Sequence, residues 1–83
     1  SKVIITNDEL PTHILMITNL PPSVTNKKML EDKCINFEDF IEVRLVPNRL
    51  DVAYIEFENP MSATSAKTII EKQNFTVSYA PAT

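Results

Sequence analysis

Two runs of alternating polar and apolar residues in the middle of the chain constrain its fold more than any other feature. The first run covers residues 42–46 and the second covers residues 51–58. A period of two places successive side chains on opposite faces of a strand, so each run is typical of a strand with one buried and one open face. The intervening Pro47-Asn48-Arg49-Leu50 has the composition of a turn. The sequence therefore predicts an antiparallel hairpin over residues 41–57.

Four more elements flank this hairpin. A strand is predicted at residues 14–18, ended by Pro21-Pro22, because proline cannot donate a hydrogen bond to a sheet. A helix follows, with Thr25 as the expected N-cap. Its apolar stripe is expected to comprise Met29, Leu30, Cys34 and Phe37.

The second half of the chain repeats the helix-then-strand order. Asn59-Pro60 is a typical helix start, a capping residue followed by proline at the first helical position. Residues 73–74 end this helix, and alternation resumes over residues 75–80 as a last strand. Its buried stripe is expected to comprise Ala63, Ala66 and Ile70, backed by Ile69.

The predicted order is strand, helix, strand, strand, helix, strand. This order indicates the α+β class and a ferredoxin-like βαββαβ sandwich, with a four-stranded antiparallel sheet and two helices on one face. From the hairpin, the buried face is expected to hold Val43, Leu45, Ala53, Ile55 and Phe57. The open face is expected to hold Met16, Thr18, Glu42, Arg44, Val46, Val52, Tyr54, Glu56, Thr76 and Ser78.

Composition limits the classes of function. The 83 residues suffice for one small domain, expected at residues 12–83, with residues 1–11 as a lead-in or linker segment. Eight basic and eleven acidic residues give a net charge of −3, which argues against strong, sequence-independent nucleic-acid binding. A single cysteine permits no internal disulfide and favours a reducing compartment. The longest apolar run, residues 14–17, is too short to span a membrane.

The absence of glycine is also informative. Glycine-rich phosphate-binding loops are excluded. Backbone positions that need a positive φ must use asparagine or aspartate instead. Asn48, Asn59 and Asn74 stand at expected element boundaries and are the candidates.

Two segments resemble the strand motifs of the RNA recognition motif family. Residues 15–20 with Pro21 are similar to its first-strand motif, and residues 50–57 are similar to its third-strand octapeptide. The resemblance covers residues 14–80. The string from residues 42–57 is moreover similar to the C-terminal motif of spliceosomal small nuclear ribonucleoprotein (snRNP) proteins.

The resemblance implies a nuclear protein of pre-mRNA splicing that has a further motif N-terminal to this one. The implied partners are single-stranded RNA, either snRNA or pre-mRNA, and snRNP proteins. It implies no cofactor, no membrane partner and no small-molecule substrate.

The chain departs from the family at positions that contact RNA. The three sheet positions where the family places base-stacking aromatics are Met16, Val52 and Tyr54, so only Tyr54 can stack. Leu50 and Asp51 replace the usual basic residue and glycine. Two functions therefore stay open: weak or assembly-dependent RNA binding, and protein interaction through an apolar patch of Met16 and Val52.

The RNA-binding candidates occupy the open face, the hairpin tip and the start of the first helix. For each cation there is an alternative: Arg44 pairing with Glu42 or Glu56, Arg49 lying solvated at the tip, and the lysines forming an ordinary solvated helix start. The candidates are Met16, Thr18, Lys27, Lys28, Arg44, Arg49, Val52 and Tyr54.

Catalytic chemistry has little support in the sequence. His13 is the only histidine and is expected at the edge of a strand, while Cys34 lies on an apolar stripe and is expected to be a core thiol. No nucleophile–base pair and no Cys/His metal-binding cluster is evident. We therefore expect a binding domain without catalytic or metal-binding residues.

Overall fold

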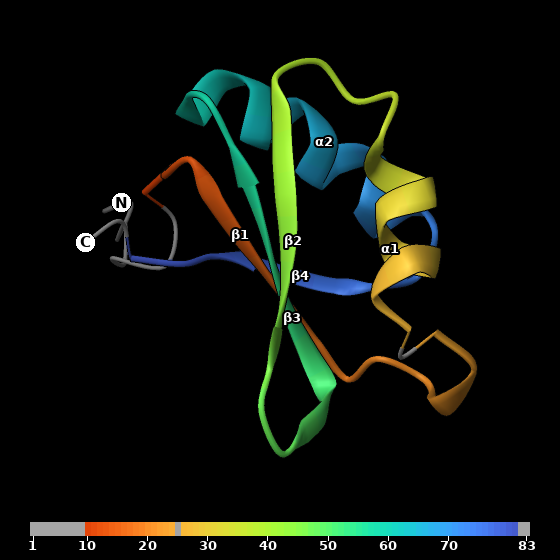
Figure 1. The fold of residues 1–83 in the computed structure, drawn as a ribbon. Helices are drawn as coiled ribbons and strands as arrows, with labels where there is room; N and C mark the ends of the chain where they lie inside the picture. The colour runs from red at the N-terminus through yellow and green to blue at the C-terminus, as the bar shows by residue number, and fades with distance from the viewer. Residues whose placement is uncertain (1–9, 25, 82–83) are drawn as a thin grey trace.

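The computed structural model describes residues 10–24 and 26–81, and the predicted lead-in segment falls mostly outside them. Its elements follow the predicted order (Figure 1). They are β1 (Ile14–Thr18), a short 3₁₀ helix η2 (Pro22–Val24), α1 (Lys27–Cys34), β2 (Phe40–Val46), β3 (Arg49–Phe57), α2 (Pro60–Lys72) and β4 (Thr76–Tyr79).

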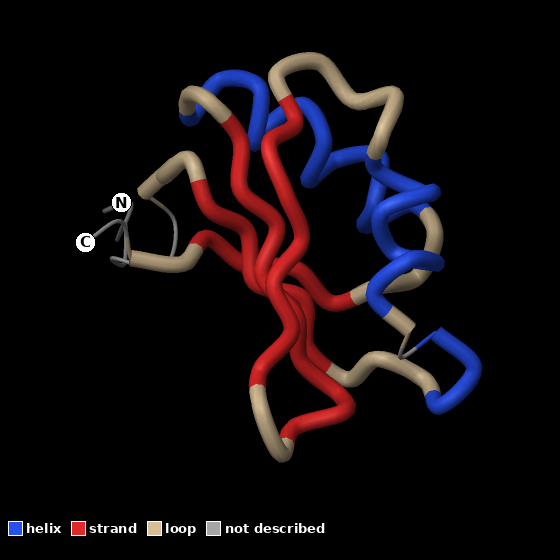
Figure 2. Tube along the Cα trace, viewed as in Figure 1, coloured by secondary structure: helices blue, strands red, loops and turns tan. Residues whose placement is uncertain are grey.

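The four strands form one antiparallel sheet in the order β2-β3-β1-β4. Both helices lie against the same side of this sheet, and the other side is left uncovered by helices (Figures 1 and 2). The predicted α+β, ferredoxin-like architecture is therefore confirmed. The hairpin formed by β2 and β3 extends past the helices at its turn end (Figure 1).

The core lies between the sheet and the helices. Leu15, Ile55 and Phe57 are fully buried on the sheet side. Phe57 is enclosed by two other aromatic rings, with centroids of Phe37 at 6.3 Å and Phe40 at 6.2 Å. Helix α2 contributes its predicted buried residues, Ala63, Ala66 and Ile70. Small alanines on this stripe let the helix axis lie close to the sheet.

Three apolar residues expected in the core are exposed instead. Met29 is 44% exposed, Leu45 40% and Ile69 46%. Met29 and Ile69 each precede a buried residue by one position, and one residue turns a helix by about 100°, which takes both side chains off the buried stripe. Leu45 belongs to an edge strand near the end of the hairpin that the helices do not cover. The stripe of α1 is also shorter than predicted, because the helix ends at Cys34 and Phe37 packs from the following turn.

Asparagine and aspartate replace glycine at tight backbone positions. Within the described residues, a positive φ occurs at Asn19 (57°), Asp39 (62°), Asn48 (65°) and Asn74 (71°). Two of these, Asn48 and Asn74, were predicted. The third predicted position is wrong, since Asn59 has a φ of −152° and serves as a helix cap.

Both helices begin at asparagine caps. In α1 the cap is Asn26, whose Oδ1 accepts a hydrogen bond from the Lys28 N–H at 2.7 Å. The predicted cap, Thr25, is therefore wrong by one residue and itself lies outside the described residues. In α2 the predicted cap is confirmed, with Asn59 Oδ1 accepting from the Ser62 N–H at 2.8 Å. Its amide also donates to Asp39 Oδ2 at 3.2 Å, which ties the start of α2 to the residue before β2.

Replacing Asn59 with alanine is expected to lower the free energy of unfolding by about 1 kcal/mol. The substitution leaves the Ser62 N–H without its partner and removes the link to Asp39. Chemical denaturation would measure the change. Asn59→Ser is the control, since serine can also cap a helix, and an equal loss in both variants would contradict a capping role.

Candidate nucleic-acid interface

A strip of three side chains crosses the open face of the sheet. Tyr54 lies at its centre, because the strand register places Met16 of β1 opposite Tyr54 on one side and Arg44 of β2 opposite it on the other. Directly opposed residues of antiparallel strands have Cβ atoms about 4.5–5.5 Å apart. Met16 and Tyr54 are half-buried and Arg44 is exposed. The strip therefore offers one aromatic ring flanked by a thioether and a guanidinium group.

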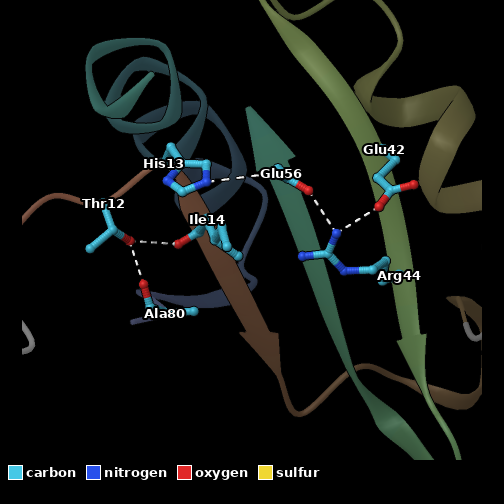
Figure 3. Close-up of polar contacts among 7 residues, drawn as sticks. All are labelled: Thr12, His13, Ile14, Glu42, Arg44, Glu56 and Ala80. Atoms are coloured by element: carbon cyan, nitrogen blue, oxygen red, sulfur yellow. Dashed lines mark hydrogen bonds and ion pairs between the residues drawn. The ribbon is translucent and has the colours of Figure 1, made fainter. Parts of the chain in front are cut away.

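Arg44 is held by two carboxylates. Its Nη1 donates to Glu42 Oε2 and to Glu56 Oε1, each at 2.6 Å (Figure 3). These bonds, first the one to Glu56 and then the one to Glu42, raise the pKa of Arg44. The predicted pairing of Arg44 is confirmed, so its charge is balanced within the sheet rather than left for a phosphate group.

The chain of polar contacts extends to the start of β1. His13 Nε2 lies 3.5 Å from Glu56 Oε2, the carboxylate oxygen that does not face Arg44 (Figure 3). The sequence analysis placed His13 at a strand edge but did not predict this contact. The period-two pattern could not reveal it, since His13 precedes the strand and its partner lies on β3.

A hollow of about 380 Å³ opens beside the Tyr54 ring. Such a volume falls within the range of about 300–1,000 Å³ that is usual for small-ligand sites. Thr12 links two parts of its wall, because its hydroxyl hydrogen is shared between the Ile14 and the Ala80 carbonyl oxygens (Figure 3). The lining residues are Ile14, Arg44, Tyr54, Ala80 and Pro81.

Three lining residues of this hollow were absent from the predicted interface. Ile14 could have been found, because it precedes Met16 by two positions and so shares its face. Ala80 likewise follows Ser78 by two positions. Pro81 gives no such signal, since it lies beyond the predicted strand and the period of two does not apply to it.

Val52 is not available on the open face as predicted. It is 7% exposed. The pairing of β2 and β3 shifts between Leu45, which opposes Ala53, and Val46, which opposes Arg49. Residues 50–52 are thus extra residues on β3, and such a bulge bends and twists the strand locally. The predicted apolar patch of Met16 and Val52 is therefore wrong, and the apolar side chain exposed in this stretch is Leu50, at 75%.

Arg49 forms a local ion pair at the hairpin tip. Its Nε donates to Asp51 Oδ1 at 3.1 Å, and both side chains are about half exposed. The bond from Arg49 lowers the pKa of the Asp51 carboxyl. An approaching phosphate would therefore meet a neutral pair.

The remaining candidates lie at the margins of the strip or away from it. Thr18 is half-buried and opposes Thr76 of β4 at the end of β1. Lys27 and Lys28 are exposed on α1, which covers the opposite side of the sheet (Figure 1). Lys28 also lies 3.6 Å from Asp32. The structure thus brings Met16, Arg44 and Tyr54 together and separates the two lysines from them.

Three observations bear on other kinds of function. Burial raises the pKa of the Cys34 thiol to about 11, consistent with the predicted core thiol. Across residues 10–24 and 26–81, no group of three or more His, Cys, Asp or Glu side chains is arranged to hold a metal ion. Over the same residues, neither helix is long and apolar enough to cross a membrane.

Comparison with known proteins gives three findings. The RNA recognition motif family matches residues 15–76. U1 small nuclear ribonucleoprotein A of Drosophila melanogaster is 40% identical over 73 residues, which cover 88% of this chain and 33% of that protein. U1 small nuclear ribonucleoprotein usp102 of Schizosaccharomyces pombe is 37% identical over 63 residues, which cover 74% and 25%. The chain therefore spans about a third or less of the length of these curated relatives.

Proposed function

The chain belongs to the RNA recognition motif family, and from that membership we propose that it binds single-stranded RNA weakly, as one part of a spliceosomal snRNP acting in pre-mRNA splicing in the nucleus. The snRNP context comes from the names of its relatives. The observation that carries the RNA-binding proposal is the position of Tyr54, central on the open face and beside a hollow.

The proposed contact is one RNA base stacked on the Tyr54 ring. Stacking of a base on an aromatic side chain contributes about 1–3 kcal/mol and accepts any base. Met16 flanks the ring and extends the apolar surface, and the hollow gives space for the sugar or a neighbouring base. The other two positions where the family pattern has base-stacking aromatics are occupied by Met16 and by the buried Val52. The face therefore provides one aromatic ring for stacking instead of three.

Electrostatics limits the affinity of this contact. The chain carries a net charge of −3, and the two arginines nearest the proposed site are paired with carboxylates. Counterion release from phosphates, which supplies most non-specific affinity, is therefore small. We place the dissociation constant at the weak end of non-specific binding, about 10⁻⁴ M or above. Stronger binding in the particle would come from neighbouring RNA-binding parts acting together with this one.

Titration of the ¹⁵N-labelled domain with a short single-stranded RNA tests the proposal. We expect saturable amide shifts in β1 and β3 around Met16 and Tyr54, with little change at Lys27 and Lys28. Raising the salt concentration from about 50 to 200 mM should weaken binding far less than the 10³–10⁵-fold seen for proteins with many phosphate contacts. Unchanged spectra at about 1 mM RNA would overturn RNA binding by this chain.

A second candidate function is protein interaction, which one observation favours. Leu50 is exposed at the hairpin end of β3 and lines a separate hollow of about 260 Å³. Leu20, Pro22 and Asp51 complete that lining. An exposed leucine in a concave surface suits an apolar side chain of a protein better than RNA. The same titration distinguishes the two, because RNA binding shifts Tyr54 and leaves this hollow unchanged.

A further inference from the structure

Strand β2 forms one edge of the sheet and is suited to pairing with another strand. In the described part of the chain, no strand pairs with its outer side. An edge strand presents unpaired N–H and C=O groups to solvent, and proteins usually protect it with charged side chains, proline, bulges or short length. Strand β2 contains neither lysine nor proline and has seven residues, against four in β4 at the other edge.

The sequence of β2 is complementary to itself. It reads Phe-Ile-Glu-Val-Arg-Leu-Val, with Val43 at the centre. If two copies pair antiparallel about a twofold axis at Val43, each Glu42 lies opposite Arg44 of the other copy. Each Ile41, at the irregular end of β2, then lies near Leu45 of the other copy. Opposite charges and apolar pairs directly across antiparallel strands both stabilise the pairing.

The charges also select this register over its neighbours. A twofold axis at Glu42 would place the two Glu42 carboxylates opposite each other, and an axis at Arg44 would do the same for the guanidinium groups. Like charges directly opposite each other destabilise a strand pair. Only the Val43-centred register therefore matches both charges.

The side chains that this pairing would cover are exposed in the single chain. Ile41 is 48% exposed and Leu45 is 40% exposed, although both are large and apolar. Arg44 already bonds Glu42 and Glu56 of its own chain. Its guanidinium group has further N–H donors, so a second copy's Glu42 can be added without loss of the bond to Glu56.

We propose that this chain self-associates through β2 into a symmetric dimer in which two four-stranded sheets become one continuous sheet. A twofold axis perpendicular to the sheet leaves the helices of both copies on one side and both Tyr54 strips on the other. Irregular pairing at both ends of β2 keeps the regular ladder short, and each copy carries a net charge of −3. The dimer is therefore weak, reversible and dependent on concentration.

Charge reversal at Glu42 and at Arg44 tests the proposal. Sedimentation equilibrium of the unaltered chain up to about 1 mM should show a monomer–dimer equilibrium. Glu42→Arg alone and Arg44→Glu alone should each be monomeric, because each places like charges opposite each other. Mixing these two variants should restore dimers, since every opposed pair then has opposite charges. Lys28→Glu is the matched control for Arg44→Glu and should dimerise like the unaltered chain.

Three results would overturn the proposal: a monomer at every concentration, dimers that persist in both single variants, or a mixture that stays monomeric. Amide spectra of each variant must match the folded domain. Where Arg44→Glu perturbs the fold through Glu56, the double variant Glu42→Arg with Arg44→Glu decides. It restores the complementary pattern in reversed order and should dimerise.

Discussion

Phe57→Ala is expected to lower the free energy of unfolding by about 3–5 kcal/mol, the usual cost of truncating a buried aromatic residue. The ring is fully buried and lies between Phe37 and Phe40. Truncation removes two aromatic contacts and leaves a cavity in the core. The total stability of an 83-residue domain is on the order of 4–12 kcal/mol, so this loss removes about a quarter of it or more.

Denaturant unfolding followed by circular dichroism would measure this loss. Phe57→Leu is the matched control, because leucine keeps most of the apolar volume and should cost clearly less. A loss below about 1 kcal/mol for the alanine variant would show that the core can close around the missing ring, contrary to the packing described above.

Tyr54→Ala is expected to weaken RNA binding by about 1–3 kcal/mol, or roughly 5- to 150-fold, because the face has one stacking platform. The fold should tolerate the change, since Tyr54 is half-buried on the open side and outside the main core cluster. Amide-shift titrations with the same short RNA would give both dissociation constants.

The control for this variant is Tyr54→Phe, which keeps the ring and removes only the hydroxyl group. It should bind RNA nearly as well as the unaltered chain. Equal affinity of the alanine variant and the unaltered chain would show that RNA, where it binds, does not stack on this residue.

The order of elements could be predicted from the sequence because its signals are local. Alternation in residues 51–58 and the Asn59-Pro60 helix start each depend on neighbouring residues, and both predictions are confirmed. The exposure of a side chain was harder to predict where its strand lies at the edge of the sheet. Leu45 has the pattern of a buried residue, but it lies on an edge strand near the uncovered end of the hairpin.

The candidate site was predicted in part for the same reason. Period two placed Met16, Arg44 and Tyr54 on one face, and the structure brings them together. Val52 follows the same period yet is buried, and the pairing of β2 and β3 is irregular beside it. The contact of His13 with Glu56 joins residues distant in sequence, so no local pattern could reveal it.

The two carboxylates around Arg44 have a consequence for how this face can evolve. Glu42, Glu56 and Arg44 together carry one net negative charge. A glutamate codon becomes a glutamine codon by one nucleotide change, and each such change would make this cluster more positive by one unit. Two point mutations would thus leave Arg44 as the only charged member of the cluster, without altering a core residue. Two such mutations would therefore change this cluster on the open face from one that repels phosphate to one that attracts it. The fold would stay the same.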